Sequence, residues 1–167
     1  MYFANFPLIP YDSVGNGDFK LVTNLMKRVA LRSKVRTNTL LYDTYDVKEG
    51  ETPEMLADKL YGDSNLHWII MYVNGITDRY HQWPLSTPQF LAFVNDKYSN
   101  PDGTHHYEIT QTSGDTTVTI DIGSDNTSHG DATLVTNYEY EVSRQDTLRK
   151  IRLLDSTYVD QFVEEFE

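Results

Sequence analysis

The apolar residues of this chain change their spacing once, and that change limits the fold classes open to it. Between residues 52 and 98 they recur every three or four positions, as on one face of a helix. Between residues 105 and 122 they alternate with polar residues, as in a half-covered strand. A chain of this kind builds separate helical and sheet regions, so we expect an α+β protein.

Composition narrows the expectation further. The chain has 167 residues, of which 39% are hydrophobic, which suits one domain or a small domain with appendages. It has no cysteine, which excludes a disulfide framework, a thiolate nucleophile and any zinc site that uses Cys. No apolar run approaches the ~20 residues of a transmembrane helix. The N-terminus has no basic, apolar secretory signal.

Charge is unevenly distributed along the chain. The formal net charge is −11, yet residues 1–40 hold six basic and two acidic residues, while residues 101–167 hold four basic and fourteen acidic ones. The acidic total argues against general binding to nucleic acid, which depends on cationic contacts to phosphate. The asymmetry predicts that the two ends meet different partners, although a simply solvated acidic surface is an equal alternative.

The N-terminal forty residues are predicted to form two segments. Residues 1–17 read as an extended aromatic arm, because Pro7 and Pro10 forbid a regular helix there. Such an arm would pack on the chain's own core or on a neighbouring subunit. The apolar spacing in residues 18–31 predicts a helix, and a basic linker follows up to residue 40.

Residues 41–100 read as a mainly helical module that opens with a strand at 42–48. Thr52 and Pro53 are favoured residues for the cap and first position of a helix, and Gly62 is a favoured stop. The next helix carries an apolar face that includes Trp68 and stops at Asn74-Gly75. A third helix follows a capping box formed by Ser86 and Gln89.

Residues 101–154 are expected to be rich in β-structure, with a Gly-containing turn at 113–115. A helix that covers residues 155–167 closes the chain, with its apolar residues on one face. Such a short helix is marginal alone and must dock on something. The expected segments of the β-rich region are a hairpin over 105–122, a long loop over 123–137, an extended stretch at 138–142 and a strand at 151–153.

The sequence offers little for catalysis. Neighbouring histidines on a strand, such as His105 and His106, point to opposite faces and would not chelate together. No phosphate loop, dinucleotide fingerprint or nucleophile elbow occurs. We therefore expect no enzyme, no cofactor and no metal site. The histidines are His67, His81, His105, His106 and His129.

The central module resembles a LysM module over about thirty residues. The turn glycine lets the strand reverse, Thr52 caps the first helix, and Trp68 fills the space between two short helices. After Asn74 the chain departs from the pattern, because residues 77–86 do not return into a second strand. This departure argues against carbohydrate binding. The resemblance rests on Tyr45, Val47, Gly50, Thr52, Leu56, Ala57, Tyr61, Trp68, Ile69 and Asn74.

A longer series of motifs occurs together along the chain. The motifs, in order, are Glu49–Glu54, Leu60–Asp63, His67–Ile70, Trp83–Ser86, Lys97-Tyr98, His105–Tyr107 and Tyr158–Phe166. This series resembles the LysM-containing baseplate wedge family of contractile-tailed bacteriophages. The resemblance implies a structural subunit of the virion tail, assembled in the bacterial host cytoplasm. Its partners would be other wedge subunits and adjacent wedges, with the central hub as a further candidate, and not nucleic acid, membrane or a small-molecule substrate.

Aromatic and apolar residues near both ends are candidate partner contacts, because aromatic side chains are enriched at protein interfaces. The alternative is that they close the subunit's own core. A peptidoglycan-binding LysM module is the competing function, in which Tyr61 and residues near Asp63 would contact the glycan. A tail-associated lysin would need a catalytic carboxylate in a cleft. The candidate contacts are Tyr2, Phe3, Phe6, Leu8, Ile9, Tyr158, Phe162 and Phe166.

Overall fold

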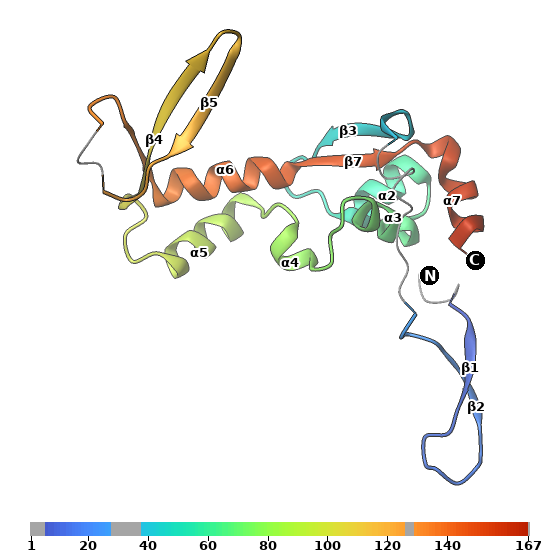
Figure 1. The fold of residues 1–167 in the computed structure, drawn as a ribbon. Helices are drawn as coiled ribbons and strands as arrows, with labels where there is room; N and C mark the ends of the chain where they lie inside the picture. The colour runs from blue at the N-terminus through green and yellow to red at the C-terminus, as the bar shows by residue number, and fades with distance from the viewer. Residues whose placement is uncertain (1–5, 28–37, 126–128, 167) are drawn as a thin grey trace. The chain divides into compact units, whose positions relative to one another are not determined.

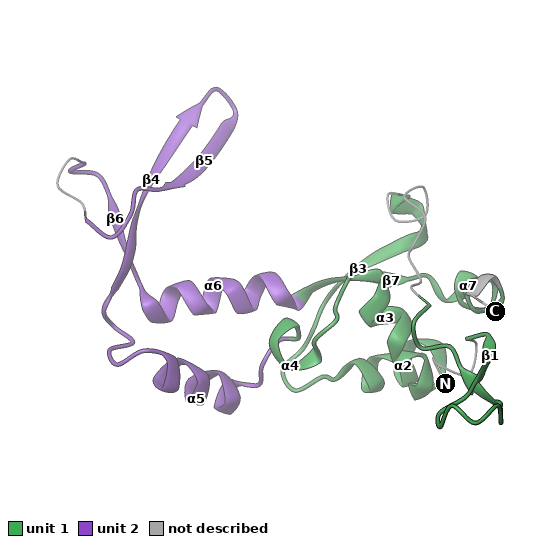
Figure 2. Cartoon of the chain, turned by 60° about the horizontal axis from the view of Figure 1, so that its bottom comes forward, with its two compact units in different colours: residues 1–83, 150–167 green, residues 84–149 purple. Residues whose placement is uncertain are grey.

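The computed structural model describes residues 6–27, 38–125 and 129–166 of the chain. The fold mixes short helices with small antiparallel sheets, which confirms the α+β class (Figure 1). The chain divides into two compact units (Figure 2). Unit 1 comprises Met1–Trp83 and Lys150–Glu167, and unit 2 comprises Pro84–Arg149. Unit 2 is thus inserted into the sequence of unit 1.

The helices at the centre of unit 1 begin and end where the sequence predicts. In α2 (Pro53–Tyr61) the hydroxyl of Thr52 accepts a hydrogen bond from the Met55 N–H, and Gly62 ends the helix with a φ of 74°. The 3-10 helix η3 (Ser64–Leu66) then leads into α3 (His67–Val73), which ends at Asn74. These outcomes confirm the predicted caps and stops.

Two strands from distant parts of the sequence complete this module. Strand β3 (Tyr42–Asp46) pairs antiparallel with β7 (Lys150–Leu154), so that Tyr42 lies opposite Leu154 and Asp46 opposite Lys150. The strand expected at 151–153 is confirmed. Residues 77–86 do not form the second strand of this module. That strand is β7, which follows unit 2 in the sequence and pairs with β3.

The core of unit 1 lies between these helices and the sheet. The indole N–H of Trp83 donates to the Glu51 carbonyl at 2.8 Å, which satisfies a buried donor. The short α4 (Arg79–Gln82) precedes Trp83. One buried cluster joins Val47, Leu56, Ala57, Ile70, Trp83, Ile151 and Leu153, and a second joins Trp68, Ile69, Val73, Leu154 and Val159.

The C-terminal helix docks on this core. After the 3-10 helix η4 (Ser156–Tyr158), α7 (Val159–Phe166) buries Val159 and packs Phe162 against the second cluster. The ring of Phe162 lies 6.0 Å from that of Trp68 and 6.3 Å from that of Tyr72, centroid to centroid. The predicted terminal helix is confirmed, and it docks on its own subunit.

The helix predicted over residues 18–31 is wrong for the residues that the structure describes there. Strands β1 (Leu8–Tyr11) and β2 (Lys20–Thr23) pair as an antiparallel hairpin, and residues 28–37 lie outside the described residues. A short run of apolar residues fits both the helical and the strand period, and β2 contains Val22 and Thr23, which favour strands. The 3-10 helix η2 (Thr39–Leu41) then leads into β3.

Unit 2 contains α5 (Thr87–Lys97), a sheet in the strand order β5-β4-β6, and α6 (Asn137–Arg149). The capping box of Ser86 and Gln89 is present at the start of α5. The hairpin expected over 105–122 is confirmed as β4 (Thr104–Ser113) and β5 (Thr116–Asp121).

Two predictions within unit 2 are wrong. The segment 133–136 of the expected loop is strand β6 (Thr133–Thr136), which pairs with β4. The expected extended stretch at 138–142 is part of α6. Alternating Tyr138, Tyr140 and Val142 imitate a strand. The helix also makes buried or part-buried contacts through polar Glu141 and Gln145, one helical turn apart, which give no apolar helical pattern.

The two adjacent histidines also differ from expectation. A β-bulge between Thr104 and His106 breaks the alternation of β4, so His105 and His106 do not point to opposite faces. Their Nδ1 atoms lie 2.8 Å apart. The ring of His105 stacks on that of Tyr140 from α6, with centroids 3.8 Å apart.

Candidate functional site

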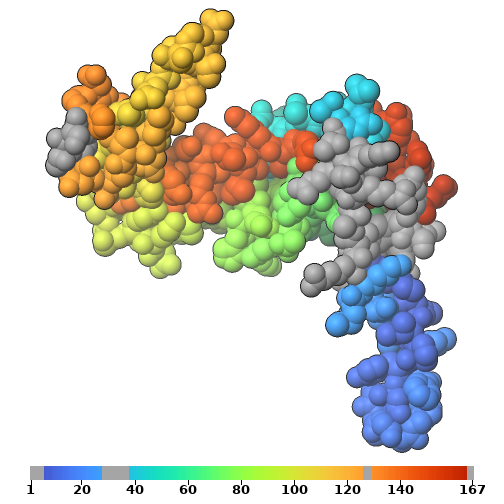
Figure 3. Space-filling model, in the orientation of Figure 1, coloured from blue at the N-terminus to red at the C-terminus, as the bar shows by residue number. Residues whose placement is uncertain are grey.

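The most conspicuous surface among the described residues is the β1–β2 hairpin. Leu8 is 60% exposed and Leu21 71% exposed, although each lies in a strand whose partner is formed. Figure 3 shows the side chains of this hairpin, in blue, at the surface. An apolar cluster of this kind usually marks a site of protein contact. The hairpin surface consists of the exposed Leu8, Tyr11, Val14, Phe19, Leu21, Val22, Leu25 and Met26.

The loop of the hairpin is ordered by one carboxylate. Asp12 accepts backbone hydrogen bonds from Val14 at 3.1 Å, Gly15 at 2.6 Å and Gly17 at 2.8 Å. These bonds, led by that from Gly17, lower the pKa of Asp12. Both glycines have a positive φ, which side chains with a Cβ rarely adopt. The loop therefore presents the apolar strands in a defined conformation.

The arm residues nominated as contacts lie in different environments. Phe6 is buried, Leu8 is exposed and Ile9 is half-buried. Tyr2 and Phe3 lie outside the described residues. Leu8 thus belongs to the hairpin surface, whereas the Phe6 side chain is already covered.

The C-terminal nominations also divide. Tyr158 is exposed, but Phe162 is half-buried against Trp68 and Tyr72 of its own chain. The side chain of Phe166 lies outside the described residues. For Phe162 the geometry matches the alternative in which the helix closes its own core.

Most of the hairpin surface does not follow from the sequence analysis, because the apolar spacing in residues 18–31 predicts a helix. The available signal was the alternation Phe19-Lys20-Leu21, which follows a loop with two glycines. The antiparallel partner Leu8–Tyr11 was itself recognised only as extended.

The residues of the LysM-like pattern build the core of unit 1. The side chains of Val47, Leu56, Ala57, Trp68 and Ile69 are buried. The other members make turns, caps or hydrogen bonds, and these are Tyr45, which donates to Glu51, Gly50 with a φ of 74°, the Thr52 cap, Tyr61 and Asn74. Their role in the structure is thus to hold the module together, and the resemblance to LysM itself stays a prediction.

Tyr61 and Asn74 cover the free edge of β7. The hydroxyl of Tyr61 donates to the Leu154 carbonyl at 3.0 Å. The amide nitrogen of Asn74 donates to the Arg152 carbonyl at 2.7 Å, and its amide oxygen accepts from the Arg152 N–H at 2.8 Å. The Asn74 side chain therefore replaces the neighbouring strand that β7 lacks on that side.

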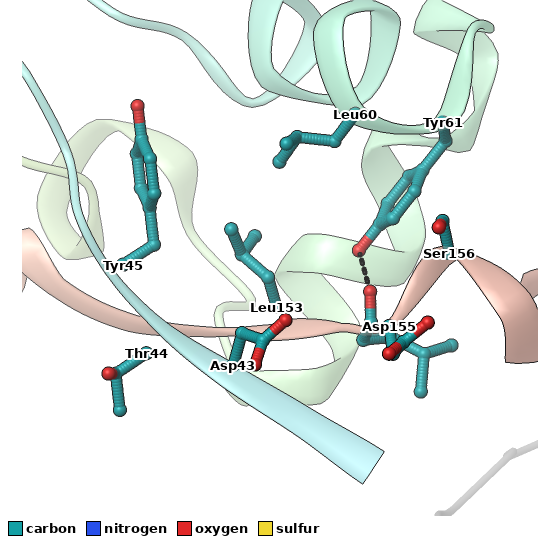
Figure 4. A pocket seen from close by; sticks show the side chains of 9 residues that line it. Asp43, Thr44, Tyr45, Leu60, Tyr61, Leu153, Asp155 and Ser156 are labelled. Carbon is teal, nitrogen blue, oxygen red and sulfur yellow. Dashed lines mark hydrogen bonds between the residues drawn. The ribbon is translucent and has the colours of Figure 1, made fainter.

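A small groove lies beside this edge (Figure 4). Its volume is about 280 Å³, slightly below the ~300 Å³ at which ligand sites begin. Burial raises the pKa of Tyr61 to about 12, so its hydroxyl stays protonated and is already engaged with Leu154. Asp63 accepts hydrogen bonds from Asn65 instead of facing the groove. The lining residues are Asp43, Thr44, Tyr45, Leu60, Tyr61, Leu153, Leu154, Asp155 and Ser156.

Among the described residues of unit 2, two ionisable side chains are buried, and both make polar contacts. His106 is 7% exposed and its Nε2 lies 3.0 Å from the Glu108 carboxylate, while its Nδ1 faces His105. Glu141 is 1% exposed and accepts from the Lys97 ammonium at 2.5 Å and the Tyr98 hydroxyl at 2.9 Å. Such groups tie β4 and α5 to α6.

The described residues form neither a metal-binding cluster nor a membrane-spanning helix. Within ranges 6–27, 38–125 and 129–166, no cluster of three or more suitable side chains could hold a metal ion. None of the helices in those ranges is long and apolar enough to span a membrane.

These features define the class of the protein. It is a small α+β protein with an exposed apolar hairpin, and its buried polar groups make contacts within the fold. Proteins of this kind act through contacts with other proteins. The family model described as "Base plate wedge protein 53" matches residues 1–126, so the chain belongs to that family. The chain is 24% identical to "Baseplate wedge protein gp53" of Enterobacteria phage T4 over 174 residues, which cover 95% of this chain and 83% of that protein.

Membership in this family confirms the expected role as a structural subunit of a phage baseplate. It places the chain in the virion tail and implies contact with other baseplate components. The family is one of structural proteins, while the expected absence of enzymatic activity stays a prediction.

Proposed function

We propose that this chain joins wedge subunits to one another and to neighbouring wedges in the baseplate of a contractile-tailed phage, and that the β1–β2 hairpin makes the principal contact. The hairpin surface is the observation that carries the proposal. Its strands have only four residues each, and an isolated two-stranded hairpin is marginal in water. A partner that covered Leu21 or Phe19 would gain ~1.5–3 kcal/mol per side chain.

We also propose where the subunit assembles and which proteins it contacts. Assembly takes place in the host cytoplasm, where a chain without cysteine needs no oxidation step. The partners are other wedge subunits and adjacent wedges, with the central hub as a further candidate. Nucleic acid, membrane and small-molecule substrates are not among them.

A triple variant tests the contact. Phe19→Ser, Leu21→Ser and Leu25→Ser together remove apolar area that is already exposed, so the fold of unit 1 is expected to persist. Incorporation into wedges, measured by co-sedimentation, is expected to fall strongly. The matched control is the double variant Met55→Ser and Leu91→Ser, which changes exposed apolar residues on α2 and α5. If both variants are incorporated equally well, the hairpin does not form part of the interface.

Glycan binding is the second candidate, and the groove in Figure 4 is the observation in its favour, because the Tyr45 and Tyr61 side chains lie on its walls. Purified cell-wall sacculi provide the test. The whole chain is required, since β7 is one of the two strands of the β3–β7 sheet, which lines the groove. Saturable binding that Tyr45→Ala abolishes would favour glycan binding. The absence of binding would contradict glycan binding and favour a purely structural role.

A further inference from the structure

The strand edges of the two-stranded sheets β3–β7 and β1–β2 differ. The register of β7 turns the backbone groups of Arg152 and Leu154 away from β3, and the side chains of Asn74 and Tyr61 satisfy them. Uncovered strand edges invite pairing with other chains, so this edge is protected. The β1–β2 sheet also has two strands, but among the described residues no side chain makes a hydrogen bond to the backbone of Leu8–Tyr11 or Lys20–Thr23.

The phase of the β1–β2 ladder shows which backbone groups point outward. The N–H of Asn24 donates to the Pro7 carbonyl at 2.9 Å, which makes these two residues a hydrogen-bonded pair. Such pairs alternate with pairs whose backbone groups point away from the partner strand. With the observed register, the outward groups belong to Leu8 and Pro10 on β1 and to Leu21 and Thr23 on β2.

The two edges of the hairpin are therefore unequal. Pro10 has no N–H, so β1 lacks a donor at the middle of its outer edge, where proline is commonly found. On β2 the N–H and carbonyl of Leu21 and the N–H of Thr23 point outward. The Thr23 carbonyl accepts from the Leu25 N–H at 3.0 Å, which ends the available edge there. Strand β2 can pair with a short extended segment, and β1 is poorly suited to do so.

Charge indicates what kind of segment fits. Lys20 lies within β2 and Lys27 follows it. Asp18 lies just before β2, and it is the one acidic residue against six basic residues between positions 18 and 42 of the sequence. Opposite charges across paired strands are favourable and like charges are unfavourable. An acidic partner strand is therefore preferred.

We propose that the outer edge of β2 pairs with an extended, acidic segment of another wedge protein, which adds a third strand to the hairpin. The backbone of Leu21 and Thr23 provides the hydrogen bonds, and Lys20 provides the charge preference. This inference rests on the proposed function and specifies the mode of contact.

Proline substitution separates edge pairing from side-chain contact. The double variant Leu21→Pro and Thr23→Pro removes the two outward donors, while the ladder bonds between Ile9 and Val22 remain. The control, Leu21→Ala and Thr23→Ala, removes the side chains but keeps both donors. With wedges assembled without this subunit as the probe, we expect the proline variant to bind about tenfold or more weakly than the alanine control. Equal binding would overturn edge pairing.

Amide hydrogen exchange gives a second readout that does not depend on substitution. In the free protein the N–H groups of Leu21 and Thr23 should exchange quickly, whereas that of Val22 is held in the ladder. On binding to wedges, protection should rise at Leu21 and Thr23 together. Protection that rises at neither position, in a chain that does bind, would overturn the inference.

Two further outcomes identify the partner and separate the proposals. Lys20→Glu should weaken binding, and the wild-type affinity should fall with salt. Self-association of the free chain through the same amides, seen by sedimentation and exchange, would overturn a heterologous partner. A wild-type chain that does not bind wedges would overturn the proposed function itself, whereas wild-type binding with equal proline and alanine variants would overturn only the pairing mode.

Discussion

At the scale of single residues, polar side chains satisfy backbone groups that a neighbouring strand would otherwise satisfy. Asn74 satisfies both backbone groups of Arg152, and its Nδ2 atom also donates to the Ile70 carbonyl at 2.8 Å. It therefore joins the end of α3 to β7, across 78 positions of sequence. Sequence reasoning placed Asn74 at a helix end, but it could not supply the partner, because β7 lies on the far side of unit 2.

The Asn74 contacts predict a specific sensitivity. Asn74→Asp removes the donor to two carbonyl oxygens and places a carboxylate beside them, so unfolding of unit 1 should become easier by about 1–3 kcal/mol. Urea unfolding followed by tryptophan fluorescence measures this, because Trp68 and Trp83 both lie in unit 1. The control Asn95→Asp makes the same change at an exposed position of α5. Similar stabilities for the two variants would contradict the role given to Asn74.

Glu141 predicts a dependence on pH in unit 2. Burial alone would raise the pKa of this carboxyl, but the hydrogen bonds from Lys97 and Tyr98 hold it below its ordinary value. A lowered pKa in the folded state gives stability that is present at neutral pH. That stability is lost as the pH falls from about 4.3, the ordinary value for Glu, through the lower pKa of the folded state.

Glu141→Gln should therefore destabilise unit 2 by about 1–3 kcal/mol at pH 7, and by progressively less below pH 4. Urea titrations followed by the NMR signals of α6 provide the measurement. Asp146→Asn, an exposed change on the same helix, should have an effect within about 0.5 kcal/mol. A difference between wild type and Glu141→Gln that stays constant from pH 7 to pH 3 would contradict this account.

At the scale of elements, sequence succeeded where local signals agreed and failed where they competed. Helix α2 has a cap, a proline at its first position and a terminal glycine, and its bounds were predicted. In α6 the buried contact is a carboxylate, so apolar periodicity gives no helical signal. The hairpin at residues 8–23 was missed because its strands are too short for one period to exclude the other.

Helix α7 allows the two predicted roles of the C-terminal residues to be separated. Phe162→Ser should destabilise unit 1 by about 1–3 kcal/mol, because its ring packs on Trp68 and Tyr72. Tyr158→Ser changes an exposed residue and should leave stability nearly unchanged. Thermal unfolding followed by circular dichroism measures both. If the Phe162→Ser chain is as stable as the Tyr158→Ser chain, Phe162 does not stabilise the core, and it becomes a candidate partner contact again.

At the scale of the whole molecule, the two units follow from where the chain closes its sheets. Both buried clusters of unit 1 take residues from β7 or α7, and none from residues 84–149. The sequence indicated a β-rich C-terminal part, but contiguous segments could not reveal that 150–154 returns to pair with 42–46. Pairing across so many residues depends on the tertiary fold and leaves no local signal.

This organisation predicts that unit 1 folds without unit 2 but not without β7. A chain in which a flexible Gly/Ser linker of about ten residues replaces 84–149 keeps both clusters and the β3–β7 pair. It should give dispersed NMR signals and a cooperative thermal transition. A chain that ends at Trp83 lacks Ile151, Leu153 and Leu154 and leaves the amide of Asn74 without Arg152, so it should not fold cooperatively. A folded 1–83 fragment would show that unit 1 does not need β7. An unfolded linker variant would show that unit 1 needs unit 2.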